Sequence, residues 1–311
     1  MRLLKYTGRL KMDLLSRLLS QSAPQTHLFF AGNLCERSES RDYPDGGHLH
    51  LLRRGELMLS DETGGRWQLT TPTLVMFPKG RAHRLEPQQL AGCDLVCASF
   101  SLGPNTDSPL QQALPEVLVL PLSEVALLEP VLAMLFDEAF AARYGQTSML
   151  SRLLEMLIIL LLRYIVAQGL CQHGMLAALS DSKLAKAMLL MHERKDEPWT
   201  VASLAQGAGM SRARFAEHFQ RLIGQSPLAY LTQLRMTQAC QQLLQGQSVL
   251  AVALNNGYSS QTAFSRAFVR AIGMSPARWL KAQQVKTAHD VRLPFSHNGN
   301  AEAPLAVYLL S

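Results

Sequence analysis

The sequence predicts an α+β multidomain protein: an N-terminal β-barrel, a helical segment, and a C-terminal all-α domain built as a tandem repeat. Short apolar runs between turn residues predict the barrel, and longer stretches of helical periodicity follow them. The third observation is a duplication, because "GMSRARFAEHFQRLIGQSP" (209–227) returns as "GYSSQTAFSRAFVRAIGMSP" (257–276). Such a repeat indicates a duplicated structural unit. With 311 residues, of which 48% are hydrophobic, the chain is long enough for more than one core.

The N-terminal part, from about residue 29 to residue 120, has the pattern of short β-strands. Apolar runs alternate with the turn signals "DGG", "ETGG" and "PKG". The runs are "HLHLL", "ELMLSD", "WQLTT", "TLVMFP" and "DLVCASFSL". Regularly spaced short strands of this kind predict a barrel or a sandwich.

Helical periodicity begins at Ser123 and continues to Gly169. Two helices are predicted there, with Ser123 and Thr147 as N-caps and with Gly145 and Gly169 as stops. The most apolar run, "MLIILLLRYIV", contains Arg163 and is shorter than the roughly twenty apolar residues of a membrane span. It therefore predicts a buried or partner-facing helix and no membrane contact.

The N-terminal stretch "MRLLKYTGRLK" is basic, but no apolar run or small-residue cleavage site follows it, which argues against a secretory signal. A start at Met12 is an alternative to a start at Met1. The five cysteines form no zinc or disulfide framework, so a cytoplasmic protein is expected.

Each copy of the repeat has the pattern of a helix, a tight turn at Gly209 or Gly257, and a second helix. Aromatic residues at helical spacing give each second helix one apolar face. They are Phe215 and Phe219 in the first copy and Phe264 and Phe268 in the second. This pattern predicts two helix-turn-helix units, whose second helix enters the major groove of DNA.

The charge of the repeat region supports a polyanionic partner. Nine Lys and Arg residues lie between Val201 and Lys286, and Glu217 is the only acidic residue there, whereas the whole chain has a net charge of +6. Between the copies, residues 227–245 predict one helix about 28 Å long. This length is close to the ~34 Å between successive major-groove faces, so we expect the two units to read adjacent grooves.

The segments "WTVASLAQGAGMSRARFAEHFQRLIGQSPLAYLTQLRMTQACQQLL" and "VLAVALNNGYSSQTAFSRAFVRAIGMSPARW" together resemble the DNA-binding domain of AraC/XylS-type transcription regulators. The resemblance covers about residues 185–284. It implies sequence-specific binding to double-stranded promoter DNA, commonly as an activator. It also implies control by an N-terminal domain and RNA polymerase as a partner.

Positions on the two second helices predict which residues contact DNA. Base contacts are expected from Arg212, Ala213, Ala216 and Glu217 in the first unit and from Gln261, Thr262 and Arg266 in the second. Backbone contacts are expected from Arg214, Arg221 and Arg270. For any single arginine, simple solvation at the surface is the alternative.

The stretch from His48 to Leu85 resembles the cupin barrel that many of these regulators carry. Its motif residues are His50, Gly55 and Glu56, followed by "PKGRAH" (78–83). Cupin enzymes hold a metal with such residues, and here His48, His50, Glu56 and His83 supply the types. Five residues separate His50 from Glu56, more than the enzyme pattern prefers, so histidines packed in a metal-free barrel are the alternative. We expect no bound cofactor.

Three cysteines, Cys35, Cys93 and Cys97, are candidates for sensing an oxidant. Cys93 and Cys97 lie four residues apart on a predicted strand, a separation of about 13 Å that no disulfide spans. Cys35, which is expected in a mobile segment before the barrel with Arg37 nearby, is the candidate partner of either one. The segments "MDLLSRLLSQSAP", "PKGRAHRL" and "CDLVC" resemble the subgroup that includes reactive-chlorine-responsive regulators. Inert burial of the cysteines is the alternative, and Cys171 and Cys240 are assigned no sensing role.

A homodimer is predicted through the second helix of the middle segment, alone or with the preceding helix, because its apolar face exceeds the needs of one small barrel. The face consists of Leu150, Leu153, Leu154, Leu157, Leu161 and Ile165.

The expected organisation has five parts. They are a cupin-like sensor domain at 12–121, a helical dimerisation segment at 122–170, a linker at 171–182, the DNA-binding domain at 183–285 and a tail at 286–311. The predicted function is transcription regulation without enzyme activity, controlled by cysteine oxidation or by a small effector in the barrel. A cupin metalloenzyme with an accessory DNA-binding domain and a nonspecific DNA-binding protein are the alternatives.

Overall fold

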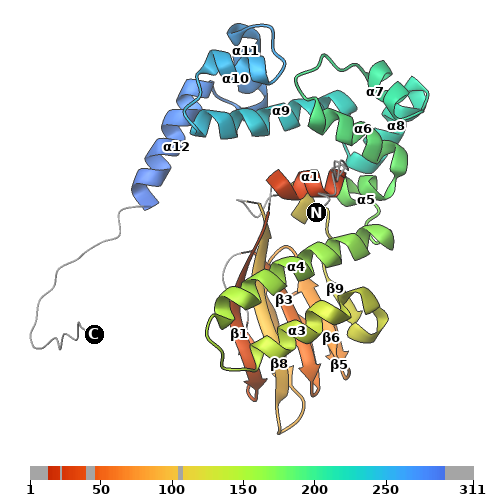
Figure 1. Ribbon diagram of the computed structural model, residues 1–311, viewed down its shortest axis with the longest axis vertical. Helices are drawn as coiled ribbons and strands as arrows, with labels where there is room; N and C mark the ends of the chain where they lie inside the picture. The colour runs from red at the N-terminus through yellow and green to blue at the C-terminus, as the bar shows by residue number, and fades with distance from the viewer. Residues whose placement is uncertain (1–12, 22, 40–45, 104–107, 291–311) are drawn as a thin grey trace, which may run out of the picture. The chain divides into compact units, whose positions relative to one another are not determined.

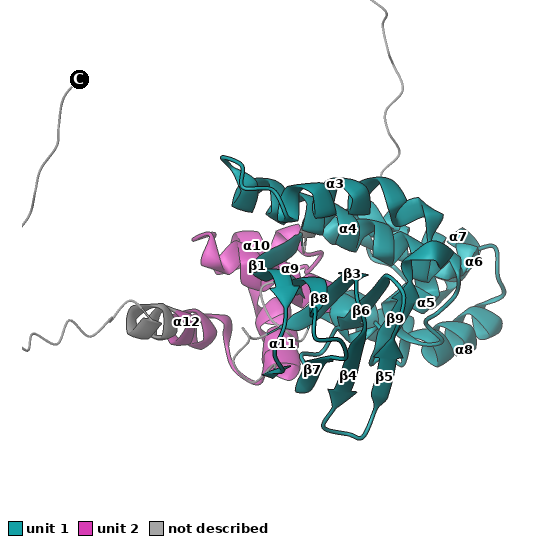
Figure 2. Cartoon of the chain, turned by 90° about the horizontal axis from the view of Figure 1, so that it is seen from below, with its two compact units in different colours: residues 1–232 teal, residues 233–311 magenta. Residues whose placement is uncertain are grey.

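A computed structural model gives the structure of the chain and describes residues 13–21, 23–39, 46–103 and 108–290. It divides into two compact units, residues 1–232 and 233–311 (Figure 2). The division falls inside helix α9 (Pro227–Leu244), where the sequence predicts one continuous helix. The question of the start residue, and the tail beyond Asp290, lie outside the described residues.

Two antiparallel β-sheets form the N-terminal domain, as the sequence predicts (Figure 1). One sheet contains, in spatial order, β1 (Pro24–Leu34), β8 (Cys93–Leu102), β3 (Gly47–Arg54), β6 (Thr73–Phe77) and β9 (Leu118–Pro121). The other contains β2 (Ser38–Glu39), β7 (His83–Pro87), β4 (Leu57–Asp61) and β5 (Arg66–Leu69). The five predicted runs form β3, β4, β5, β6 and β8, but β1 begins at Pro24, before the predicted start near residue 29.

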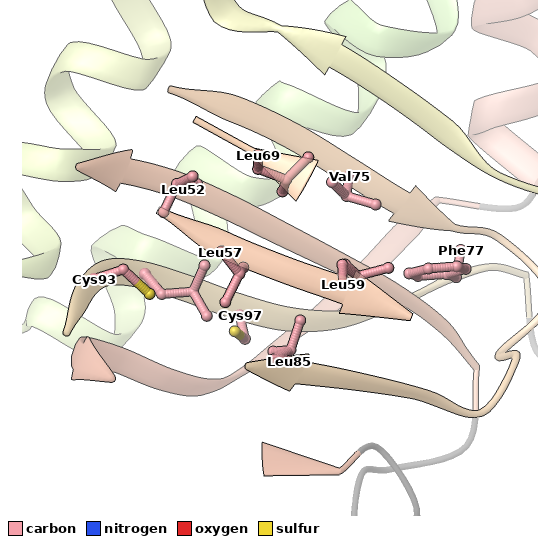
Figure 3. Close-up of a cluster of buried hydrophobic side chains, with 10 residues drawn as sticks. Leu52, Leu57, Leu59, Leu69, Val75, Phe77, Leu85, Cys93 and Cys97 are labelled. Atoms are coloured by element: carbon pink, nitrogen blue, oxygen red, sulfur yellow. The ribbon is translucent and has the colours of Figure 1, made fainter. Parts of the chain in front are cut away.

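The space between the two sheets is filled by apolar side chains (Figure 3). Leu52, Val75 and Cys97 come from the five-stranded sheet, and Leu59 and Leu85 come from the four-stranded sheet. All five are almost completely buried. The barrel interior described here is therefore a packed core, in which cysteine serves as a small apolar residue.

Helices α3 (Glu129–Ala139) and α4 (Gln146–Ala167) lie across the outer face of the five-stranded sheet (Figure 1). Leu49 and Leu51 of β3 alternate with the residues that point between the sheets, and both are buried all the same. The hydroxyl of Thr26 on β1 donates a hydrogen bond to the Ser151 carbonyl oxygen of α4 at 3.1 Å. All five residues of the run "HLHLL" are thus buried because both faces of β3 are covered.

The predicted N-caps Ser123 and Thr147 are wrong. Ser123 lies in a 3₁₀ turn (Leu122–Glu124), a second turn follows (Ala126–Leu128), and α3 starts with a proline in its first turn. Gly145, predicted as a helix stop, is the N-cap of α4 with φ +78. Glycine adopts this left-handed conformation without steric cost, and α4 begins at the next residue.

The apolar face of α4 from which a homodimer is predicted is already buried within this chain. Leu150, Leu153, Leu154, Leu157, Leu161 and Ile165 are between 0% and 3% exposed. Helix α3 and strand β1 pack against α4. The prediction that these six residues contact a second copy is therefore wrong. Among the described residues, no helix is both long and apolar enough to cross a membrane.

Further helices complete the described part of the first unit. They are α1 (Leu14–Gln21), α2 (Pro109–Gln112), α5 (Gly174–Ser180), α6 (Ser182–Glu193), α7 (Val201–Gly207), α8 (Arg212–Ile223) and the first part of α9. Helix α5 lies inside the range predicted as a linker, 171–182, and packs against α4 and α8. Its Leu176 and Ala178 are fully buried. Burial of these apolar side chains thus packs the segment against neighbouring helices, so this part of the predicted linker is a folded helix.

The second unit contains the rest of α9 together with α10 (Val249–Asn255), α11 (Gln261–Ile272) and α12 (Pro276–Asp290). Its core joins Met236 and Ala239 of α9 to Val252 of α10 and to Phe264 and Phe268 of α11. The aromatic face predicted for the second copy of the repeat is thus confirmed as core.

Candidate nucleic-acid interface and sensor site

The first helix-turn-helix unit consists of α7 and α8. Thr200 caps α7 by accepting a hydrogen bond from the Ser203 backbone N–H, and the Ser203 hydroxyl completes a capping box. Gly209 forms the turn with φ +65. Phe215 and Phe219 are fully buried, which fixes the rotation of α8 about its own axis and leaves the opposite face in solvent.

The second unit, α10 and α11, repeats this construction. Ser248 and Ser260 cap the two helices through hydrogen bonds to the backbone N–H groups of Ala251 and Ala263. Gly257 forms the turn with φ +76, and Gly273 ends α11 with φ +85, as Gly224 ends α8 with φ +84. The positions that require glycine therefore recur in both copies, because the same turn is made twice.

The structure leaves the predicted base-contacting side chains accessible. In the first unit Arg212, Ala213 and Glu217 are exposed and Ala216 is half-buried. In the second unit Gln261, Thr262 and Arg266 are exposed. Arg214, Arg221 and Arg270, predicted to contact the DNA backbone, are exposed as well. Each set lies on the face of its helix that the phenylalanine core leaves free.

Three of the four candidate metal ligands meet inside the barrel. His48 and His50 lie on β3, and His83 begins β7 on the facing sheet. All three are buried, and the ring centroids of His48 and His50 lie 5.3 Å and 4.7 Å from that of His83. The His83 ring stacks on Phe77, with centroids 4.4 Å apart.

Hydrogen bonds define the proton positions in this cluster. The Nδ1 atom of His83 lies 2.7 Å from the carbonyl oxygen of Arg81, so Nδ1–H donates and Nε2 is left as the acceptor of the neutral ring. The Nε2 atoms of His50 and His83 are 2.7 Å apart, so His50 donates to His83. Burial lowers the pKa of His83 to about 4 and the pKa of His50 well below its ordinary value.

Glu56 does not join the histidines. It lies in the turn between β3 and β4, after Gly55 with φ +93, and its carboxylate accepts a hydrogen bond from the Gln89 amide at 3.0 Å. Strand alternation does not extend from His50 to Glu56 because β3 ends at Arg54. Within the described residues, no group of three or more His, Cys, Asp and Glu side chains is arranged to hold a metal ion. The donor set of a metal-binding cupin is therefore not assembled here.

The candidate redox cysteines gather at one end of the barrel. Cys35 directly follows β1 instead of preceding the barrel, and Leu34 is paired with Cys93 in the β1–β8 register. A Cβ atom placed on Gly92 would lie 3.0 Å from the Cys35 sulfur. Cys35 is therefore a neighbour of Cys93, whereas Cys97 lies further along β8, opposite Phe30. Because β1 begins at Pro24, earlier than the sequence pattern predicts, its pairing with β8 brings Cys35 to the turn before β8.

The surroundings of the cysteines differ. Cys35 is exposed, and its thiol donates a hydrogen bond to the Asn33 side-chain oxygen at 2.9 Å. The nearby Arg37 guanidinium pairs with the carboxylates of Glu39 at 2.9 Å and Glu86 at 3.9 Å.

Burial holds the other thiols protonated. It raises the pKa of Cys93, helped by the charges of Asp94 and Cys35, to about 11. Burial also raises the pKa of Cys97 well above its ordinary value, and it raises the pKa of Cys240 to about 11 and that of Cys171. Cys35 is thus the accessible thiol of the three candidates.

Comparisons with known proteins agree with this architecture. A family model described as Cupin matches residues 13–167, and one described as Helix-turn-helix domain matches residues 204–282. The chain is 32% identical, over 86% of its own length and 97% of the relative's, to the RCS-specific HTH-type transcriptional activator RclR of Escherichia coli (strain K12). It is 26% identical to the HTH-type transcriptional regulator MtrA of Neisseria gonorrhoeae, covering 87% of this chain and 98% of that protein.

Solved structures are similar over most of the chain or over its C-terminal part. ToxT from Vibrio cholerae O395 is 12% identical with a TM-score of 0.35, covering 83% of this chain and 97% of that one. The DNA-binding domain of AdpA, in complex with a target DNA, is 35% identical with a TM-score of 0.31. That match covers 33% of this chain and 95% of the AdpA domain.

Proposed function

Since the chain belongs to the AraC-type family of transcription regulators with an N-terminal cupin domain, we propose that it activates transcription from specific promoters in the cytoplasm, under control of the cupin domain. The observation that carries the proposal is the pair of helix-turn-helix units with exposed polar faces, Arg212 to Glu217 on α8 and Gln261 to Arg266 on α11. Arg and Gln side chains suit bidentate contacts with guanine and adenine edges. RNA polymerase is the proposed partner in activation.

Genomic binding with the full chain tests this proposal. Chromatin fragments recovered with the protein should share a sequence, and the purified chain should bind a duplex of that sequence at least about 10³ times more tightly than random DNA. Equal affinity for both duplexes would instead indicate a nonspecific DNA-binding protein. Loss of transcription from the nearest promoter on deletion of the gene tests the activator role.

We further propose that an oxidant provides the signal through Cys35, with Cys93 as its partner. The position of Cys35 beside the strand end that carries Cys93 supports the pairing, and the name of the relative RclR supports the chemistry. Hypochlorous acid is the candidate oxidant: the two S–H bonds are lost, the S–S bond forms, two electrons pass to the oxidant, and the other products are water, chloride and one proton released to solvent. The bond would tie the residue after β1 to the first residue of β8.

Replacement of the cysteines separates this signal from the alternative. Hypochlorous acid should increase promoter binding by the wild-type chain, and Cys35→Ser should abolish the increase. Cys171→Ser is the matched control, because Cys171 lies outside the barrel. A full response in a chain with Cys35→Ser, Cys93→Ser and Cys97→Ser would favour a small effector bound in the barrel.

We propose that the chain forms a homodimer through the outer faces of α3 and α4. Met134 on α3 and Met156 on α4 are 56% and 48% exposed, and Leu127 before α3 is 52% exposed. These residues lie opposite the buried face of the helix pair, and flexible methionines suit an apolar contact between copies. A two-fold dimer would present paired DNA-binding domains to paired half-sites.

A further inference from the structure

A cavity of about 630 Å³ opens on one side of helix α8, entirely within the first unit. One wall is the corner between α5 and α6, and we call it the 180–183 corner after its residues Ser180, Asp181, Ser182 and Lys183. The other wall is one face of α8 and the preceding turn, with Met210, Arg214, Glu217, His218 and Arg221. The cavity therefore joins the DNA-contacting helix to the segment that follows the sensor domain.

The lining carries three cations and two carboxylates. Lys183, Arg214 and Arg221 are exposed and supply the positive charges, while Asp181 and Glu217 supply the negative ones. Strongly polar walls do not suit an apolar effector, since ligand pockets of this size are lined mostly by hydrophobic and aromatic side chains. The excess of cations instead suits an anion.

The orientation of α8 places this cavity beside the base-contacting face. An α-helix turns by about 100° per residue, so Arg221 lies roughly 40° and Arg214 roughly 60° from Glu217 in the same direction around the axis of α8. Phe215 and Phe219 occupy the buried side. When a recognition helix lies in the major groove, the phosphates that border the groove run along its flanks, where this cavity opens.

A chain of hydrogen bonds crosses the cavity. An Arg221 guanidinium N–H donates to Nδ1 of His218 at 2.8 Å, and Nε2–H of His218 donates to the Oδ2 atom of Asp181 at 2.6 Å. Because arginine only donates and a carboxylate only accepts, His218 in this chain is the neutral tautomer protonated on Nε2. The negative charge of Asp181 is thereby held against the cationic face of α8.

Asp181 also holds the start of α6. Its Oδ1 atom accepts hydrogen bonds from the backbone N–H groups of Lys183 and Leu184, both at 3.0 Å. Partial burial opposes its ionisation, but the hydrogen bonds from His218, Leu184 and Lys183 outweigh burial and lower the pKa of Asp181. The carboxylate is ionised at neutral pH and holds the backbone of Lys183, which lines the same cavity as Arg214 and Arg221.

We propose that this cavity is a binding subsite for a DNA backbone phosphate, in which Lys183 of α6 acts together with Arg214 and Arg221, and in which the Asp181 carboxylate weakens phosphate binding. The proposal rests on the DNA-binding function and adds to it residues outside the helix-turn-helix itself. It makes the 180–183 corner a determinant of affinity for every DNA sequence.

The test is the salt dependence of DNA binding by the full chain. The probe is a fluorescein-labelled duplex of random sequence, about four helical turns long, titrated by fluorescence anisotropy at a series of KCl concentrations around the physiological value. Lys183→Ala should lower affinity by roughly tenfold, the effect of one lost charge-assisted hydrogen bond. It should also flatten the slope of log K against log salt by about 0.9, the value for one phosphate.

Two further variants sharpen the result. Lys186→Ala is the matched control, because Lys186 is an exposed lysine one turn further along α6 and does not line the cavity. It should leave the slope unchanged. Asp181→Asn should raise affinity several-fold, since asparagine still caps α6 but no longer carries the charge. If Asp181 had a purely structural role, Asp181→Asn would lower the affinity for DNA.

The outcomes are distinguishable. No binding of the wild-type chain even at the lowest salt concentration would contradict the proposed function itself. Wild-type binding with an unchanged slope for Lys183→Ala, or with an equal loss for Lys186→Ala, would overturn the subsite alone. Stabilisation of the wild-type chain by millimolar inorganic phosphate that Lys183→Ala removes, with DNA binding unchanged, would assign the cavity to a small anion and also overturn the proposal.

Discussion

The Nε2 atoms of His50 and His83 lie 2.7 Å apart, so a buried hydrogen bond joins the two sheets of the barrel. The bond needs one donor and one acceptor, and the accepting nitrogen, Nε2 of His83, must therefore be unprotonated. In a metal-binding cupin these nitrogens would face the ion, whereas here each faces the other. The histidines thus have a structural role that depends on pH.

Acid should destabilise the sensor domain through these rings. The His83 pKa is about 4 in the folded chain, against about 6.5 when unfolded, so the unfolded chain takes up the proton first as pH falls. The stability is fully present above pH 6.5 and is lost as pH falls toward 4, by about 2 kcal/mol between about pH 7.5 and about pH 5 for His83 alone.

Urea unfolding followed by circular dichroism at the two pH values measures this loss. His83→Gln should reduce the difference between them, and His173→Gln, at an exposed position, should leave it as in the wild type. His192 is buried, and burial lowers its pKa to about 4, so a residual pH dependence of the same sign is expected. An identical pH dependence with and without His83 would contradict the assignment.

Alkylation should distinguish Cys35 from the other cysteines. Iodoacetamide reacts with accessible thiolates, and Cys35 is exposed whereas burial raises the pKa of the Cys93 and Cys240 thiols to about 11. Brief treatment of the folded chain at mildly alkaline pH, followed by peptide mass spectrometry, should label Cys35 first. Labelling in urea provides the control in which all five react alike. Preferential labelling of Cys97 in the folded chain would refute the described burial.

Two arginines on α11 should differ in their effect on DNA binding. Arg266→Ala should cost about 1–3 kcal/mol at the specific site and relax the preference at one base pair, because a base contact is lost. Arg270→Ala should weaken binding to all sequences alike and flatten the salt slope by about 1, because a phosphate contact is lost. Affinities on specific and random duplexes check both variants, and identical behaviour of the two would remove the distinction between their roles.

A charge on the outer face of α4 should separate the dimer. Met156→Glu would place a carboxylate in the proposed apolar contact and should yield a monomer in sedimentation velocity at micromolar concentration. Leu90→Glu adds the same charge at an exposed position of the barrel and serves as the control. Leu154→Ala, in the buried face, should instead lower the free energy of unfolding by about 2–5 kcal/mol. Monomeric wild-type protein would exclude this dimer.

The sequence by itself determines the two helix-turn-helix units almost completely. Gly209, Gly257, Thr200 and the phenylalanine pairs act within a few residues of their own position, through turn conformation, capping and helical periodicity. Such local signals can be recognised in the sequence without knowledge of the rest of the fold. Strands β3, β4, β5, β6 and β8 follow for the same reason, since short apolar runs and turn residues are local signals.

Only the tertiary structure decides which faces meet. Helical spacing identifies the apolar face of α4, but not that the sheet and α3 cover it in place of a second copy. Strand pairing brings Cys35 to Cys93, and the turn after Arg54 carries Glu56 away from His50. Asp181 meets His218 only because α5 packs on α8. Each contact joins residues that are distant in sequence. Such contacts depend on how whole helices and strands pack and on the register of strand pairs, which local periodicity does not specify.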